Sequence, residues 1–387
     1  MQRKRWIDAL GCVCLVALCL VAWIMPAAAD TRADADIDQI FRRAKTVGGA
    51  VLVARHGELV YERYYGYADV KSQKPVTRDT YFRAASVTKF ISGIGAMGLV
   101  EDGLLDLDAD IGKMLGMDIR NPRFPDTTVT LRQLMTHTSG VDDTAGYSKT
   151  GGTLWEFLQK NPRRYFSARE PGKTFVYSNF GAGIVGALME AASGQSVNAY
   201  MTERVFGPMG IDAAYSASLL ASPQDVSTQY VGKNVDMSAQ RAVANLYEDT
   251  CDPNRHFRTT IGGLWIRPRD MLDLVSLMCM GGERNGVRLL APGTVAHMIG
   301  PQSGVGSVPG KTSYGLMTAR VENVLPGVTL YGHQGTSSGF VCGAYFDPET
   351  GYAFVLMTNG ADQRRDNRIH ILARRLIAYT YPMAVGE

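Results

Sequence analysis

The alternation of apolar and polar residues predicts β-hairpins near both ends of the chain. The runs "GGAVLVAR" and "ELVYERYYGY" are rich in β-branched and aromatic residues and meet at His56-Gly57, so residues 48–67 are expected to form one hairpin. "GFVCGAYFD" and "GYAFVLMTNG" predict a second hairpin, and "GVTLYGH" predicts a strand just before it. Helical patterns cover residues 34–45 and 368–379.

Residues 86–300 differ from these ends, because helical patterns and loops dominate there. Strands at both ends suggest one antiparallel sheet to which the N-terminal and C-terminal segments both contribute. The sequence therefore predicts an α/β fold of the α+β kind, with a sheet flanked by terminal helices and an inserted, mainly helical domain. We expect a sheet domain from residues 30–85 and 301–387, a helical domain from 86–300, and an active site in the cleft between them.

The first 29 residues have the pattern of a secretory signal peptide. Arg3, Lys4 and Arg5 are followed by an apolar run over residues 9–25 and by Pro26-Ala27-Ala28-Ala29, an A-x-A type cleavage site. The run is short for an uncleaved membrane span, which needs roughly 20 residues. We expect cleavage near Ala29, export to the periplasm or the exterior of a bacterium, and no stable membrane association afterwards.

Charge and composition indicate which kinds of partner the protein is unsuited to bind. Hydrophobic residues make up 45% of the chain and charged residues 20%, as in ordinary globular proteins. Removal of residues 1–29 takes away three basic residues and Asp8, which leaves 37 basic and 36 acidic residues. This near-neutral balance, without basic runs, argues against a nucleic-acid partner and an anionic membrane surface.

Three cysteines remain after residue 29, namely Cys251, Cys279 and Cys342. Export permits one disulfide among them, but at least one thiol stays unpaired. Cys342 lies inside "FVCGAYF" and is interpreted as a small buried hydrophobe. No His, Cys and Asp cluster has metal-ligand spacing.

Ser86 and Lys89 stand at the start of the apolar stretch "ASVTKFISGIGAMGLVEDG" and share one face if a helix begins there. Gly93, Gly95 and Gly98 each cost a helix about 1 kcal/mol relative to alanine. We therefore expect a central buried helix whose tight packing offsets them and which ends at residues 102–103. The helix N-terminus would stabilise charge on a serine nucleophile. A desolvated lysine one turn on has a lowered pKa and can take the serine proton. Chance matches to S-x-x-K are nevertheless common, roughly one or two in such a chain.

Tyr177 and Asn179 flank Ser178 just before a helical run that ends at Gly194. The simplest interpretation makes Ser178 or Asn179 the helix N-cap. A cap does not explain the tyrosine. A tyrosine hydroxyl near cationic neighbours can pass protons between nucleophile and leaving group, and Asn179 can hold a substrate carbonyl or the lysine.

The stretch "YGHQGTSSGF" allows two interpretations. Gly335, Ser337 and Gly339 spell the G-x-S-x-G nucleophile elbow of α/β-hydrolases, but an elbow needs a helix after the serine, and here a strand, a turn and another strand follow. The chain order nevertheless mimics a triad: Ser337, then Asp347 or Asp362, then His370. We favour the alternative, in which His333-Gln334-Gly335 forms an exposed strand edge and the glycines let substrate backbone approach.

Ser86-x-x-Lys89, Tyr177-x-Asn179 and His333-Gln334-Gly335 resemble, in order, the three motifs of serine β-lactamases and penicillin-binding proteins. The Y-x-N form is similar to the class C branch, which includes esterases, D-aminopeptidases and D-alanyl-D-alanine carboxypeptidases. The likeness covers roughly residues 38–362 and includes "LRQLMTHTSGV", "GGLWIRPRDM" and "GHQGTSSGF".

The resemblance implies a β-lactamase/transpeptidase-like fold and an acyl-enzyme on Ser86, with no metal or organic cofactor. Lys89 and Tyr177 would share the acid and base roles, and which of them is the base stays open. Asn179, His333 and Gly335 would bind and orient the substrate. The backbone N–H groups of Ser86 and Thr336 would form the oxyanion hole.

His333 departs from the family pattern, which usually has lysine at this place. Histidine is mostly neutral at pH 7, which weakens the case for substrates that carry a carboxylate, such as β-lactams. The leading hypothesis is therefore an exported serine hydrolase acting on a small ester, amide or peptide. The alternatives are a β-lactamase or D-alanyl-D-alanine carboxypeptidase, and a binding or sensor module without turnover. His137, in "THTSG", is interpreted as structural.

Overall fold

A computed structural model describes residues 31–147, 152–302, 313–366 and 368–386. The predicted signal peptide lies outside these residues. Ile40–Glu387 forms one compact unit, and Met1–Gln39 forms another. Helix α2 (Thr31–Arg43) spans the boundary between them. The predicted division of the larger unit into two domains stays a prediction.

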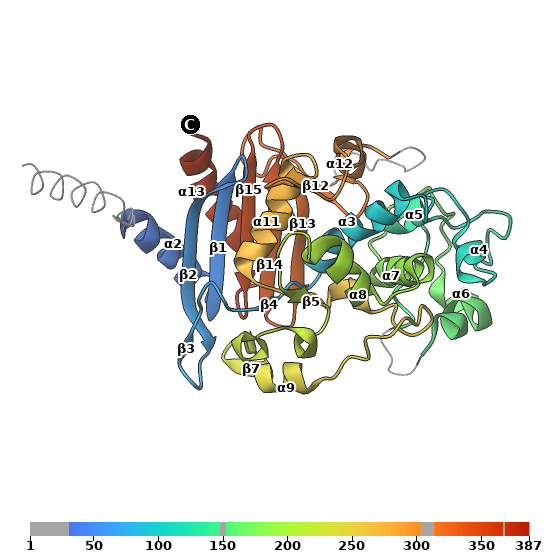
Figure 1. Cartoon of the computed structure of the whole chain (residues 1–387), viewed down its shortest axis with the longest axis horizontal. Coiled ribbons are helices and arrows are strands. Elements are labelled where there is room, and N and C mark those ends of the chain that lie inside the picture. The colour runs from blue at the N-terminus through green and yellow to red at the C-terminus, as the bar shows by residue number, and fades with distance from the viewer. Residues whose placement is uncertain (1–30, 148–151, 303–312, 367, 387) are drawn as a thin grey trace, which may run out of the picture. The chain divides into compact units, whose positions relative to one another are not determined.

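One eight-stranded sheet runs through the larger unit, and both ends of the chain contribute strands to it (Figure 1). All its pairs are antiparallel, in the order β11-β12-β13-β14-β15-β1-β2-β3. The strands are β1 (Gly48–Arg55), β2 (Glu58–Asp69), β3 (Lys74–Pro75), β11 (Ser313–Tyr314), β12 (Ala319–Val321), β13 (Leu330–Ser337), β14 (Phe340–Asp347) and β15 (Tyr352–Thr358). This arrangement confirms the predicted antiparallel sheet.

The two predicted hairpins are present as β1–β2 and β14–β15. His56 and Gly57 both have positive φ, 48° and 84°, which two-residue hairpin turns of type I′ require. The C-terminal helix α13 (Ile371–Val385) starts three residues later than predicted. The residues before it are extended instead, because β17 (Ile369–His370) pairs with β16 (Arg365–Asp366).

Both faces of the central strands are covered. Leu52 of β1 and Val355 of β15 belong to the main apolar core, together with residues of α11 (Pro268–Cys279). On the opposite face, the Tyr352 hydroxyl lies 2.8 Å from the Thr380 hydroxyl of α13. Figure 1 accordingly shows α11 in front of the sheet and α13 behind it. Burial on both faces explains the almost unbroken apolar runs of these strands.

The other helices and short helical turns belong mainly to the region that the sequence predicted to be helical. They are α3 (Val87–Glu101), α4 (Ile111–Leu115), α5 (Leu131–Met135), α6 (Pro162–Tyr165), α7 (Asn179–Ser193), α8 (Val197–Met201), α9 (Ala239–Ala244), α10 (Thr259–Gly262) and α12 (Pro292–Ile299), with short π or 3₁₀ turns at Trp155–Lys160, Thr202–Phe206, Ala217–Leu219 and Pro223–Asp225. None of the helices in the described ranges is long and apolar enough to cross a membrane.

The same region, and the residues just before it, also contain short strands that the sequence analysis did not predict. They are β4 (Phe82–Arg83), β5 (Ala213–Ala214), β6 (Gln229–Val231), β7 (Asn234–Met237), β8 (Trp265–Ile266), β9 (Glu283–Arg284) and β10 (Val287–Arg288). Strands of two to four residues leave too little periodicity to detect. The sheet β4-β8-β5 matters for the site, because it fixes the segment that leads into Ser86.

Cys251, Cys279 and Cys342 all carry free thiols in the described structure. Cys342 is buried, as predicted, and Cys279 is also buried, whereas Cys251 is exposed. The fold therefore does not use the disulfide that export would permit.

Candidate active site

Helix α3 places the first two candidate residues. Ser86 is its N-cap, and α3 ends at Asp102-Gly103, as predicted. Residues 87–99 are all buried, which confirms a central buried helix. The glycines meet close neighbours, since a Cβ added to Gly95 would lie 2.3 Å from the Met201 Sδ. The packing that glycine permits thus offsets its low helix propensity.

The residue before Ser86 is held in an unusual backbone conformation. Ala85 has φ 42°, a left-handed region that alanine rarely adopts. The β4 segment just before it is fixed to β8, and the Ala84 N–H donates a 2.8 Å hydrogen bond to the Leu264 carbonyl. Such strain persists only where the surroundings impose it, and it is common at functional sites.

Lys89 lies one helical turn after Ser86 and is fully buried, with 0% exposure. Its Nζ lies 2.7 Å from the Ile261 carbonyl oxygen, 2.9 Å from Asn179 Oδ1 and 3.2 Å from Ser86 Oγ. Burial lowers the pKa of Lys89 to about 7, and the nearby carboxylate of Asp143 opposes that shift. The lysine is therefore partly neutral at physiological pH.

The geometry around Lys89 Nζ suits a neutral amine. A neutral amine has two N–H groups and one lone pair, whereas the Ile261 carbonyl and Asn179 Oδ1 can only accept hydrogen bonds. These two acceptors take both N–H groups. The lone pair is then left for Ser86, whose hydroxyl can donate.

Helix α7 positions Tyr177 and Asn179. Its N-cap is Ser178, whose hydroxyl accepts a hydrogen bond from the Gly181 N–H, and its C-cap is Gly194, as predicted. Tyr177 is therefore the residue just before the cap, and its side chain interacts with Ser86, which acts to lower the pKa of its hydroxyl. Burial of the hydroxyl raises the pKa of Tyr177 well above its usual value of 10, although 38% of the residue's surface remains exposed along the pocket.

Asp143 is a functional residue that the sequence analysis missed. Its carboxylate accepts hydrogen bonds from the N–H groups of Asn179 (2.8 Å) and Phe180 (3.0 Å) and from the Ser178 hydroxyl (2.7 Å). Asn179 Nδ2 also donates to it at 3.2 Å. Since a carboxylate only accepts, this contact turns Asn179 Oδ1 toward Lys89. An aspartate in the loop "VDDTAGY" gave no signal, because its partners are 35 to 37 residues away.

His137 supports Tyr177, in agreement with the structural role expected for it. It follows helix α5 with φ 56° and is buried. Its Nδ1 accepts a hydrogen bond from the Ser178 N–H at 3.2 Å, and its ring centroid lies 4.3 Å from that of Tyr177. Burial keeps the pKa of His137 well below its usual value, so the ring is neutral.

The third motif lies on β13, but the His333 side chain is placed differently from our expectation. The strand edge is open as predicted, because β12 pairs only with residues 330–332 of β13 in the described structure. The His333 side chain, however, is buried (4% exposed) rather than exposed. Its Nδ1 lies 2.6 Å from the Gln334 carbonyl oxygen and its Nε2 lies 2.7 Å from the Tyr314 hydroxyl.

These contacts fix the state of His333. A carbonyl can only accept, so Nδ1 carries the proton and Nε2 accepts from Tyr314. Burial lowers the pKa of His333 to about 3, and the positive charge of Lys89 acts in the same direction. The histidine is therefore neutral with both nitrogens engaged. Tyr314 had no sequence signal, because it lies on a two-residue strand.

Gly335 also allows close packing within the protein. A Cβ at Gly335 would lie 2.6 Å from the Ala84 carbonyl oxygen and 2.5 Å from the Cys342 Sγ, and the approach of substrate backbone stays a prediction. The protein's own backbone makes the close approach. Gly335 thus allows β13 to lie against the segment that carries Ser86.

The alternative nucleophile Ser337 does not have a triad around it. It lies opposite Phe340 in the β13–β14 hairpin, so a strand follows it and not a helix. Asp347 is at the other end of β14, opposite Tyr352. Asp362 pairs with Arg364, and His370 Nε2 contacts Thr336 Oγ1 at 2.9 Å. This geometry agrees with our preference against Ser337 as an elbow nucleophile.

A pocket of about 460 Å³ brings the predicted residues together. Five of the seven line it, namely Ser86, Tyr177, Asn179, His333 and Thr336. Lys89 lies beneath it, and Gly335 supports β13. Arg365 and Arg368 also line the pocket, and Arg365 Nη2 donates to Thr336 Oγ1 at 2.8 Å. In the described ranges, no three His, Cys, Asp or Glu side chains are grouped to hold a metal ion.

A serine at a buried helix N-terminus, a lysine one turn on and a facing tyrosine, beside an antiparallel sheet, define the class of β-lactamase/transpeptidase-like serine hydrolases. The chain belongs to the Beta-lactamase family, whose model matches residues 33–379. It is 39% identical over 198 residues to esterase EstB from Burkholderia gladioli, covering 46% of this chain and 50% of that protein. It is 26% identical over 208 residues to penicillin-binding protein 4* from Bacillus subtilis, covering 50% and 44%. The chain thus spans about half the length of these curated relatives.

Solved structures show the same fold. The penicillin-binding protein homologue from Pyrococcus abyssi superposes with a TM-score of 0.70 at 21% identity, covering 93% of this chain and 78% of that one. The hydrolase EstCE1 gives 0.67 at 23% identity, covering 90% and 98%. The D-amino acid amidase from Ochrobactrum anthropi gives 0.66 at 21% identity, covering 92% and 100%.

Proposed function

We propose that this protein is an exported serine hydrolase that cleaves a small ester or amide through an acyl-enzyme on Ser86. The observation that carries the proposal is the position of Lys89 Nζ, which lies between two obligate acceptors and the Ser86 hydroxyl. A lysine with a pKa of about 7 in that position is suited to accept the serine proton.

In this mechanism Ser86 Oγ attacks the substrate carbonyl while Lys89 takes its proton. The raised pKa of Tyr177 keeps its hydroxyl protonated, so it acts as a proton relay to the leaving group and not as the base. The backbone N–H groups of Ser86 and Thr336 would hold the oxyanion. Water then attacks the acyl-enzyme, which releases the acid and regenerates Ser86. Asn179 orients the substrate and Lys89.

A β-lactamase or D-alanyl-D-alanine carboxypeptidase is the second candidate. It is favoured by Arg365 and Arg368, which bring positive charge to the pocket. The state of His333 argues against this candidate, because the ring is neutral and both its nitrogens are already hydrogen-bonded. His333 therefore offers no charged donor to a substrate carboxylate. Binding of such a substrate would depend on the arginines alone.

The experiment that separates the two is a ratio of kcat/KM values for the protein without residues 1–29. We expect p-nitrophenyl butyrate to be preferred over a chromogenic cephalosporin by at least about 100-fold, because the site lacks the usual cationic partner for the carboxylate. A ratio near or below one would favour the cell-wall or antibiotic function. Turnover of neither substrate would favour the non-catalytic binding module.

The pH dependence of kcat/KM should report Lys89. Because neutral Lys89 is the active form, kcat/KM for p-nitrophenyl butyrate is expected to rise from pH 5 to pH 8 with a midpoint near its pKa of about 7. Neither His137 nor His333 titrates in this range, since burial keeps both pKa values far lower. Stopped assays in buffers of constant ionic strength would measure the profile.

Asp143→Asn provides the matched test of that assignment. The Asp143 charge raises the pKa of Lys89, so its removal is expected to move the midpoint to lower pH. Asp142→Asn removes the neighbouring charge, whose carboxylate bonds to the Thr144 N–H and not to α7, and should leave the midpoint in place. A midpoint that stays fixed or rises in Asp143→Asn would contradict Lys89 as the titrating base.

A further inference from the structure

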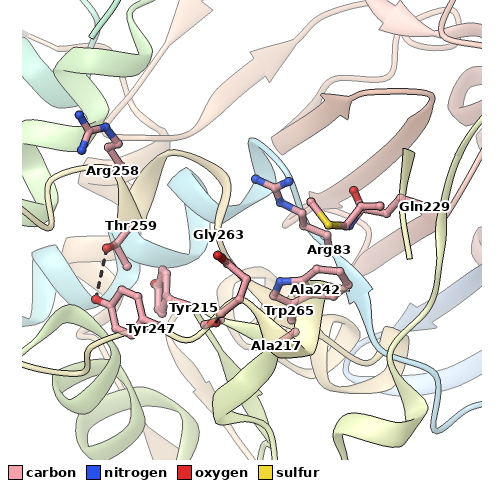
Figure 2. Close-up of a pocket in the computed structure, with 13 residues that line it drawn as sticks. Arg83, Tyr215, Ala217, Gln229, Ala242, Tyr247, Arg258, Thr259, Gly263 and Trp265 are labelled. Carbon is pink, nitrogen blue, oxygen red and sulfur yellow. Dashed lines mark hydrogen bonds between the residues drawn. The ribbon is translucent and has the colours of Figure 1, made fainter. Parts of the chain in front are cut away.

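A second pocket, of about 260 Å³, shares no lining residue with the pocket at Ser86. It lies among the small strands β4, β5 and β8, helices α9 and α10, and the strands β6 and β7. Figure 2 shows Arg83, Gln229 and Trp265 grouped toward one end and Tyr247, Thr259 and Arg258 toward the other. Its size suits a single-ring molecule better than a drug-sized ligand.

The charge of the lining is one-sided. Two arginines line the pocket, and none of the residues that line it is acidic. Arg83 Nε donates to the Gly262 carbonyl oxygen at 2.9 Å, which leaves the far end of the guanidinium toward the pocket. Burial lowers the pKa of Arg83, and exposed Asp236 offsets part of that cost without forming an ion pair in the described structure. A largely buried guanidinium with no paired carboxylate is costly.

Gln229 gives an independent indication of a ligand. The residue is 2% exposed, and neither Nε2 nor Oε1 of its side chain has a hydrogen-bond partner in the described structure. Buried amides are almost always hydrogen-bonded, so an orphaned one in a cavity wall calls for an occupant. Neighbouring residues cover both atoms, so the N–H₂ group would donate to an anion at Arg83 only after a turn of the side chain toward the pocket.

Aromatic side chains form part of the remaining wall. Trp265, Tyr215 and Tyr247 line the pocket, and the Tyr247 hydroxyl lies 3.3 Å from Thr259 Oγ1, so its polar end is already engaged (Figure 2). Aromatic faces of this kind pack well against a planar apolar ring. The pocket therefore combines a site for an anion with an apolar wall.

We propose that this pocket is a binding site for a small aromatic carboxylate, separate from the active site. The carboxylate would accept hydrogen bonds from the Arg83 guanidinium and from Gln229 Nε2, and the ring would lie against Trp265. Arginine is well suited to bind a carboxylate with two parallel hydrogen bonds. The proposal does not depend on which reaction the Ser86 site performs.

Trp265 provides the measurement. It and Trp155 are the two tryptophans beyond residue 29, and Trp155 is 46% exposed, so Trp155→Phe leaves Trp265 as the reporter in the protein without its first 29 residues. Benzoate is the probe, and benzyl alcohol is the neutral control of similar shape. We expect benzoate to change Trp265 fluorescence saturably and benzyl alcohol to bind at least about tenfold more weakly.

Three variants in the Trp155→Phe background locate the binding. Arg83→Met and Gln229→Leu each remove one polar partner, and each is expected to weaken benzoate binding about tenfold or more. Arg365→Gln changes the other pocket and should leave the Kd unchanged. Melting temperatures check that the variants fold. If Arg83→Met does not fold, Gln229→Leu still tests the proposal.

Three outcomes would overturn the proposal. The first is the absence of any saturable benzoate signal at millimolar concentration. The second is an unchanged benzoate Kd in the folded Arg83 and Gln229 variants. The third is loss of binding in Arg365→Gln, which would place benzoate in the Ser86 pocket.

Discussion

Ser86→Ala is expected to lower kcat/KM for p-nitrophenyl butyrate by about 10,000-fold or more, because no other group can form the acyl-enzyme. The substitution should be well tolerated, since the Ser86 side chain makes no capping hydrogen bond to α3. Its hydroxyl interacts with the side chains of Lys89 and Tyr177, which the proposal makes part of the reaction. Loss of rate would therefore reflect chemistry and not unfolding.

Ser337→Ala is the matched control, because Ser337 is the nucleophile of the rival interpretation. It should leave the rate close to that of the unchanged protein. Intact mass spectrometry during turnover should show an acyl adduct in the Ser337→Ala protein and none in Ser86→Ala. Full hydrolysis by Ser86→Ala, or an adduct that disappears with Ser337, would refute the proposed nucleophile.

Lys89→Ala and Tyr177→Phe should each lower kcat/KM for the same ester by about 1,000-fold, and the double variant should lose little more than either one. The two residues meet at Ser86, and the Lys89 Nζ lies 5.3 Å from the centre of the Tyr177 ring. Groups that pass one proton act as a unit, so removal of either disables the path. Losses that multiply would contradict a shared path.

Lys89→Ala needs a structural control. It leaves the Ile261 carbonyl and Asn179 Oδ1 without their buried donor, which costs about 1–3 kcal/mol for each unsatisfied group. Lys89→Met preserves the volume of the chain and should show the same kinetic loss. Melting temperatures of both variants separate loss of stability from loss of catalysis, and recovered activity in Lys89→Met would exclude a catalytic lysine.

The sequence by itself determined the features that a few neighbouring residues encode. The end of α3 at Asp102-Gly103, the cap at Ser178 and the end of α7 at Gly194 follow from helix-terminus chemistry within one or two turns. The turn at His56-Gly57 follows from the φ angles that a tight hairpin needs. Three ordered motifs were enough to predict the fold and five of the residues that line the Ser86 pocket.

Only the tertiary structure decided the chemical state of those residues. Lys89 owes its lowered pKa to burial and its orientation to Ile261, which is 172 residues away in the chain. The Asp143 carboxylate orients the Asn179 side chain, and the Tyr314 hydroxyl occupies His333 Nε2. Neither Asp143 nor Tyr314 lies in a recognisable sequence pattern. The close approach of Gly335 to Ala84 was not predicted.

The physical reason is the same in each case. Capping and turn preferences are energies of the local backbone, so they can be read from adjacent residues. Desolvation, hydrogen-bond direction and close backbone approach depend on which distant segments pack together. For this protein the sequence therefore determined which motif residues meet at the site, and the packing of α3, α7, α10 and β13 determined their burial and their hydrogen bonds.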